Sequence, residues 1–159
     1  MPKQKKKRFI GLISDTHGLV RPEALRALAG AELVIHAGDI GKVEVIETLR
    51  TIAPVVAIRG NVDQGEWADE FHDTEVVEVD PLMFYVLHDL KTLDLDPAVS
   101  RFQVVISGHS HQPWITNHNG ILFVNPGSAG PRRFKLPVAV ARLQIDGSSI
   151  HPEIVELNV

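Results

Sequence analysis

The sequence predicts an α/β protein in which two β-sheets pack together with helices on the outside. Two observations lead to this prediction. In the first half of the chain, short apolar runs alternate with amphipathic segments, as in a parallel βαβαβ unit. In the second half, short strands joined by turn sequences predominate. At 159 residues, the chain is long enough to bury one full core and is expected to form a single domain.

Three apolar runs in the first half end in glycine or polar residues, as strands buried on both faces do. The two segments between these runs carry apolar residues every three or four positions, which indicates amphipathic helices. We therefore predict strands over 9–14, 33–37 and 55–58, and helices over 21–29 and 42–52.

The second half is predicted to be mainly β-structure. Asn119-Gly120 and Asp146-Gly147 each separate two apolar runs, which is typical of hairpin turns. The segment 66–73 is predicted to be a loop, and 93–101 a short helix. Strands are predicted over 74–79, 82–87, 103–107, 114–116, 121–124, 138–145 and 149–157.

Composition excludes several classes of site. The chain has no cysteine, so it contains neither a disulfide framework nor a thiolate metal site. Its net charge of -4 argues against a surface that binds nucleic acid. Hydrophobic residues make up 44% and charged residues 23%, which is ordinary for a globular protein. The sequence leaves open whether the chain forms a homo-oligomer.

Basic residues crowd the N-terminus. We predict a flexible basic tail over 1–8 followed by a single domain over 9–159, with a phosphate-attracting arm as the alternative for the tail. The apolar run after the tail is too short for a signal peptide. No stretch approaches the roughly 20 apolar residues that span a membrane. A cytoplasmic location without membrane contact is therefore expected.

Residue types that bind metals stand directly after five predicted strands. Because parallel strands of one sheet bring their carboxyl ends together, these side chains can converge. Glycines beside them permit tight turns and close backbone approach. The residues are Asp15, His17, Asp39, Asn61, His88, His109 and His111, and the glycines are Gly18, Gly38, Gly60 and Gly108.

Seven such residues exceed what one metal ion takes from a protein and suit two ions that share a carboxylate. The mixture of imidazole, carboxylate and amide ligands favours manganese, iron, zinc or nickel over calcium or magnesium. Two ions about 3.5–4 Å apart can activate a shared water and clamp a phosphoryl group. We therefore expect two divalent transition metal ions, with manganese favoured.

The set of motifs resembles the calcineurin-like metallophosphoesterase superfamily, and its small single-domain phosphodiesterases in particular. The resemblance runs from Phe9 to about Ile145 and includes the segment 125–128. It implies a four-layer αββα sandwich with two mixed β-sheets. The motifs that carry it are Asp15-x-His17, Gly38-Asp39, Gly60-Asn61, His88 and Gly108-His109-x-His111.

The resemblance also implies a ligand set and a reaction. It assigns Asp15, His17, Asp39 and His111 to the first metal, and Asp39, Asn61, His88 and His109 to the second, and these seven residues are also the expected catalytic residues. A bridging hydroxide would attack phosphorus in a small phosphodiester substrate. A retromer subunit shares this fold and works by protein contacts, so a non-catalytic scaffold is the alternative function.

Two positions depart from the commoner family pattern. Val62 stands where many larger relatives have a histidine that protonates the leaving oxygen, and Asp89 follows His88 where a glycine is usual.

Other residues are given supporting roles. His36 is interpreted as a hydrogen-bonded core histidine. Asp63 is interpreted either as an anchor of the Asn61 loop or as a cap of the next segment. The basic segment 132–135 is either a solvated loop or a phosphate-binding rim, and Trp67 and Phe71 either pack a small core or line a substrate pocket.

Overall fold

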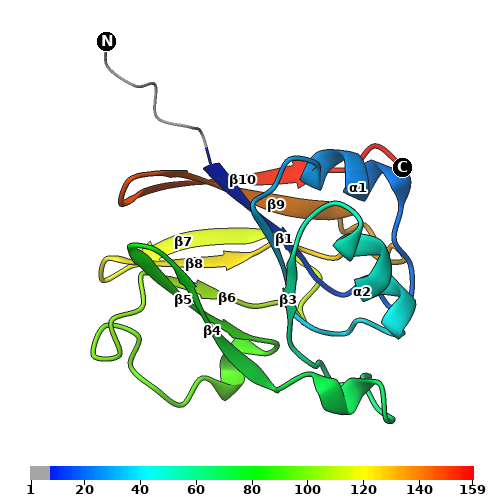
Figure 1. Ribbon diagram of the computed structural model, residues 1–159, viewed down its shortest axis with the longest axis horizontal. Helices are drawn as coiled ribbons and strands as arrows, with labels where there is room; N and C mark the ends of the chain where they lie inside the picture. Colours follow the sequence, from blue (N-terminus) through cyan, green and yellow to red (C-terminus); the bar gives the residue numbers. More distant parts are fainter. Residues whose placement is uncertain (1–7) are drawn as a thin grey trace.

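The computed structural model describes residues 8–159. The predicted tail therefore lies outside the described residues, apart from Arg8. This residue begins β1 (Arg8–Ile13), one position earlier than the predicted strand, and its guanidinium contacts the Glu32 carboxylate at 3.0 Å. Figure 1 shows the architecture of the described chain, in which two sheets are stacked and the helices lie beside one of them.

The first sheet has the strand order β10-β9-β1-β2-β3. Its strands β1, β2 and β3 are parallel, as the sequence predicts, whereas β9 runs antiparallel to β1 and pairs Arg142 with Gly11. The C-terminal hairpin thus completes the N-terminal half of the fold (Figure 1). The remaining strands of this sheet are β2 (Leu33–His36), β3 (Val55–Ala57), β9 (Ala139–Asp146) and β10 (Ser149–Glu156).

The second sheet has the order β4-β5-β6-β8-β7. Its three central strands β5, β6 and β8 are parallel, and an antiparallel strand closes each edge. Both sheets are therefore mixed, as predicted. The strands are β4 (Thr74–Val79), β5 (Leu82–Leu87), β6 (Val104–Ile106), β7 (Trp114–His118) and β8 (Ile121–Asn125).

The main core lies between the two sheets. Ile10 and Leu12 of β1 face the other sheet and pack in one cluster with Phe84 and Val86 of β5. Ile13 points to the opposite face of the first sheet, because successive side chains of a strand alternate between faces. There it packs under α1 (Pro22–Leu28) and α2 (Val43–Arg50), the two predicted helices.

The outer face of the second sheet is covered by the segment 90–102 rather than by an α-helix. The helix predicted over 93–101 is wrong: the segment forms turns, and a short 3-10 helix, η2 (Leu90–Thr92), precedes it. Leu93 and Leu95 both pack on this face, a spacing of two that a helix does not give, and Pro97 disfavours a helix at the residue before it.

A second short 3-10 helix, η1 (Ala68–Glu70), lies within the segment predicted as a loop. The α/β sandwich with two mixed sheets is confirmed. Among residues 8–159, no helix has the length and apolar character needed to cross a bilayer.

Candidate metal centre

Six of the seven predicted site residues lie close together, at the place where the carboxyl ends of the parallel strands of the two sheets meet. The sequence argument placed these ends in one sheet, but β1 and β2 belong to the first sheet, while β5 and β6 belong to the second. The site is therefore built between the sheets. The residues form two groups of three, and within each group the potential ligand atoms lie within 4.8 Å of one another. The first group is Asp15, His17 and His111, and the second is Asp39, His88 and His109.

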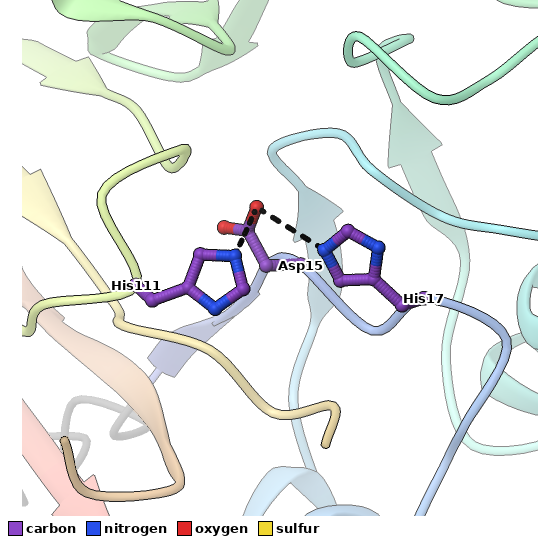
Figure 2. Close-up of side chains that lie close together, drawn as sticks. All are labelled: Asp15, His17 and His111. Carbon is purple, nitrogen blue, oxygen red and sulfur yellow. Dashed lines mark ion pairs between the residues drawn. The ribbon is translucent and has the colours of Figure 1, made fainter. Parts of the chain in front are cut away.

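The first group surrounds one carboxylate oxygen. Figure 2 shows Asp15 flanked by His17 and His111, and its Oδ1 lies 3.5 Å from His111 Nε2 and 4.0 Å from His17 Nε2. The other oxygen, Oδ2, accepts hydrogen bonds from the Ser14 hydroxyl at 2.8 Å and from the His109 N–H at 3.1 Å. Asp15 Oδ1 and His17 Nε2 are buried without a hydrogen-bond partner in the described residues. A cation fits this arrangement.

The second group is arranged around Asp39. Its Oδ2 lies 3.2 Å from His88 Nε2 and 3.8 Å from His17 Nε2, so it faces both groups. Its Oδ1 accepts the Val62 N–H at 3.1 Å, which fixes the carboxylate. His88 Nδ1 donates to the Ala37 carbonyl at 2.7 Å, which leaves the Nε2 lone pair free for a metal. Asp39 therefore lies between the two groups of candidate ligands.

His109 and Asn61 are less enclosed. The His109 ring packs edge-on against His88 at 5.2 Å between centroids, and 44% of its side chain is exposed. Asn61 has an exposed side chain in the loop after β3. Its neighbours Gly60 and Val62 nevertheless border Asp39, so the loop itself lies at the site.

Five of the seven residues have a left-handed backbone, which side chains other than glycine rarely adopt. Each such residue costs on the order of 1–3 kcal/mol and persists only where its surroundings enforce it, which is common at functional sites. Hydrogen bonds between the loops enforce it here: the Asp15 N–H donates to Gly38 O at 3.0 Å, and the His17 N–H to Asp39 O at 3.0 Å. The five are Asp15 (φ 54°), His17 (46°), Asp39 (56°), His109 (71°) and His111 (63°).

Two glycines permit the close approach of the loops. A Cβ on Gly60 would collide with Asp39 Oδ1, and a Cβ on Gly108 would collide with the Ser14 hydroxyl and lie 2.8 Å from Asp15 Oδ2. Neither glycine has a positive φ. Both positions therefore require glycine because a Cβ would not fit there, and not because the backbone conformation demands it.

Asp63 is the anchor that the sequence predicts. Its buried carboxylate accepts three backbone N–H groups: Ile40 at 3.0 Å, Gly41 at 2.9 Å and Gly60 at 2.8 Å. It thereby joins the loops after β2 and β3, which carry Asp39 and Asn61. With its oxygens engaged in this way, Asp63 supports the site and belongs to neither ligand group.

His36 is the hydrogen-bonded core histidine that the sequence predicts. Its Nδ1 accepts the Gly38 N–H at 3.0 Å, so the neutral ring carries its proton on Nε2 and donates to the Thr16 hydroxyl at 2.9 Å. Thr16 in turn donates to the Ile40 carbonyl at 2.8 Å. Complete burial, with a further contribution from the charge of His88, lowers the pKa of His36 to about 3.

The sequence argument missed the hydrogen bonds made by the segment after β8. Asn125 Nδ2 donates to the Gly108 carbonyl at 2.9 Å and to Ser110 Oγ at 3.1 Å, and the Ser128 hydroxyl donates to the Asp15 carbonyl at 3.0 Å. Asn125 and Ser128 thus hold the loops that carry four of the predicted ligands, Asp15, His17, His109 and His111. The resemblance of the segment 125–128 to the family was the available signal.

Burial and neighbouring charges shift the pKa values of several candidate ligands. Burial raises the pKa of Asp15 to about 6. Burial opposes ionisation of Asp39 as well, but the charge of His88, whose Nε2 lies 3.2 Å away, outweighs it and lowers the pKa of Asp39. Burial lowers the pKa of His111 to about 4, with the Arg133 guanidinium acting in the same direction. Carboxylates and imidazoles together form a donor set suited to a divalent transition metal.

Comparisons with known proteins identify the family of this chain. Residues 9–148 match the model of the calcineurin-like phosphoesterase superfamily domain. A probable metallophosphoesterase of Methanothermobacter thermautotrophicus is 34% identical over 92% of this chain and 91% of its own length. A phosphodiesterase of Methanocaldococcus jannaschii is 30% identical over 74% of this chain and 82% of its own length.

The fold is also found in solved structures. The structure of Vacuolar Protein Sorting 29 from Cryptosporidium parvum aligns with a TM-score of 0.80 at 21% identity, over 96% of this chain and 92% of that one. At this identity the similarity establishes the fold alone. Together with the family match and the two groups of metal-binding side chains, these findings show that the chain belongs to the calcineurin-like phosphoesterase superfamily.

Proposed function

We propose that the chain is a metal-dependent phosphodiesterase with a dinuclear centre. Asp15, His17, Asp39 and His111 would hold the first metal, and Asn61, His88 and His109 would join Asp39 at the second. The observation that supports this most strongly is the set of buried ligand atoms without hydrogen-bond partners in the described residues, Asp15 Oδ1, His17 Nε2 and His88 Nε2. Leaving such atoms unpaired costs free energy that a bound cation would offset.

The chain's own residues orient the site for hydrolysis. Two divalent transition ions, when bound, supply a hydroxide from a shared water and stabilise charge on the phosphoryl oxygens. Asp39 is held between the groups by the Val62 N–H, and His88 by the Ala37 carbonyl. The water oxygen forms a new bond to phosphorus, the ester P–O bond breaks, and its electron pair leaves with the departing oxygen.

The structure gives the departing oxygen no proton donor at position 62. The Val62 side chain is half exposed, and only its backbone N–H contacts the ligand set. General acid catalysis is typically worth about 10²–10⁴-fold in rate. We therefore expect rapid hydrolysis of aryl diesters, whose leaving group needs no proton, and slow hydrolysis of alkyl diesters. The rates of a series of diesters with different leaving-group pKa values would show a steep dependence.

A protein-interaction scaffold is the second candidate, because the fold similarity to Vacuolar Protein Sorting 29 is extensive. Several structural features favour the enzyme. Strained backbone at five of the seven predicted ligands and a buried carboxylate with a raised pKa both destabilise a chain that has no use for them. A scaffold would be free to lose these features.

The decisive experiment measures turnover against metal content. The chain is freed of metal and reloaded separately with manganese, nickel, zinc or iron, and hydrolysis of bis(4-nitrophenyl) phosphate is followed. We expect activity that rises with bound metal up to two ions per chain and is lost in Asp39→Asn. The exposed Asp69 provides the matched control, since Asp69→Asn should retain activity. Absence of turnover with every metal, despite two bound ions, would favour the scaffold.

A further inference from the structure

A cavity in the described part of the chain adjoins the second group of candidate ligands. Its volume is about 710 Å³, within the range of about 300–1,000 Å³ typical of small-molecule sites. Two segments that line the cavity are joined to candidate ligands in the sequence. The segment 89–91 directly follows His88, and the segment 107–110 contains His109. A molecule with its phosphate at the metal centre can therefore extend into this cavity.

Trp114 supplies an aromatic surface in the cavity. It begins the edge strand β7, pairs with Asn125 of β8 and remains 43% exposed. Its ring lies 6.5 Å from that of Phe123, which supports it from one side. The face of an indole ring stacks favourably on planar rings.

Two polar side chains complete the wall. Gln112 and Lys91 are exposed at the cavity, and neither side chain has a hydrogen-bond or ion-pair partner within residues 8–159. By contrast, the amide of Asn125 is already engaged with Gly108, Ser110 and Gly127. An amide and an ammonium group next to an exposed indole suit a ring with polar edge atoms or a negatively charged substituent.

We propose that this cavity binds a planar aromatic ring carried by the leaving group of the phosphodiester, with the ring stacked on Trp114. Gln112 and Lys91 contact the edge of the ring. The position of the ring on the leaving-group side rests on the proposed phosphodiesterase function, whereas binding of the ring itself does not. The ring can be an aryl group or a nucleobase, which share this chemistry.

The test measures binding without turnover. Trp67→Phe leaves Trp114 as the single tryptophan, and Trp67 packs away from the cavity against Phe71. Fluorescence of this variant, loaded with manganese, is titrated with phenyl phosphate, adenosine monophosphate and methyl phosphate. We expect saturable quenching by one or both ring-bearing ligands and none by methyl phosphate. The ligand that quenches at lower concentration identifies the preferred ring.

Calorimetry of the same ligands is repeated on Trp114→Ala. We expect affinity for the ring-bearing ligand to fall by about tenfold, the scale of a lost stacking contact, with methyl phosphate unaffected. Ile115→Ala is the matched control, because Ile115 is the next residue of the same strand, is also exposed and does not line the cavity. Equal effects of the two substitutions, or binding that does not depend on the ring, would overturn the proposal.

Turnover then separates this proposal from the proposed function. If Trp114→Ala raises KM for a bis(aryl) diester while two metals remain bound, the ring site serves the reaction. If the chain binds the ring but hydrolyses nothing, the ring site stands and the phosphodiesterase function fails. If the chain hydrolyses aryl diesters equally well with and without Trp114, the function stands and the ring site is wrong.

Discussion

The two ligand groups differ in how much of the protein encloses them. In the first group, Asp15 and His111 are buried, and Ser14 and the His109 N–H fix the Asp15 oxygen that faces away from the group. In the second group, Asp39 and His88 are buried, but His109 is nearly half exposed and borders the large cavity. The first group is closed, and the second opens to solvent.

This difference assigns separate tasks to the two sites. Ligands that the fold already holds in place lose little freedom when they bind a metal, so the closed site should bind its ion more tightly. The open site should exchange its ion more readily and meet the substrate. Asp39 faces both groups, so in the proposed centre it would couple the two ions.

Removing the shared carboxylate should have the largest effect. Asp39→Ala should remove both ions and lower kcat/KM by more than about 100-fold, the upper end for residues that merely support a ligand. Metal analysis of the purified variant, together with its kinetics, tests this expectation. Asp69→Ala, which removes only an exposed carboxylate, should change neither quantity. Retention of both ions by Asp39→Ala would show that Asp39 does not bridge.

Removing one histidine from each group should separate the sites. His109→Ala should weaken mainly the second ion, leaving about one per chain, while His111→Ala should weaken the first. Because we expect the closed site to bind its ion more tightly, His111→Ala should cause the larger total loss of metal affinity. Titration of both variants with manganese gives the comparison. The same loss from each substitution would contradict the division into a closed and an open site.

Crowding the closed group should have a smaller effect. Gly108→Ala places a Cβ against Ser14 and Asp15, and overpacking of this kind typically costs about 1–3 kcal/mol. It should lower both the free energy of unfolding and the affinity for the first ion. Gly120→Ala is a control, since its Cβ would meet nothing and the residue lies in a distant turn. That variant should lose some stability, because of its positive φ, but no metal affinity.

The smallest expected effect concerns His36 beneath the loops. The folded chain keeps this ring neutral down to about pH 3, whereas the unfolded chain takes up a proton below about pH 6.5. Unfolding therefore binds a proton between these values, and stability falls as pH falls. Between pH 6.5 and about 5 this contributes about 2 kcal/mol. Denaturant unfolding of His36→Asn should show a correspondingly shallower pH dependence, and an unchanged slope would refute the buried neutral ring.

Strand and helix positions could be predicted because they depend on local patterns. The apolar runs before Asp15 and Asp39 are strands within a residue or two of the expected bounds. The pairing of β9 with β1 could not be predicted, because register between distant segments is set by packing and not by local sequence. The segment 93–101 misled the prediction because its apolar residues cover a sheet without forming a helix.

The ligand types could also be predicted, since imidazole and carboxylate groups after apolar strands are visible in the sequence. Their geometry could not. Left-handed backbone at Asp15 and His111, and the hydrogen bonds from Asn125 and Ser128, arise only when the loops of both sheets meet. The cavity beside Trp114 likewise combines β7 with the segment after His88, which lie far apart in the chain.

The most direct test of the paired centre is electron paramagnetic resonance of the chain titrated with manganese. The first equivalent should fill the closed site and give the spectrum of isolated Mn²⁺. The second should convert it to the spectrum of a magnetically coupled pair, because Asp39 would hold the two ions within a few ångströms of each other. Two bound equivalents that keep the isolated-ion spectrum, or binding that ends at one equivalent, would contradict a dinuclear centre.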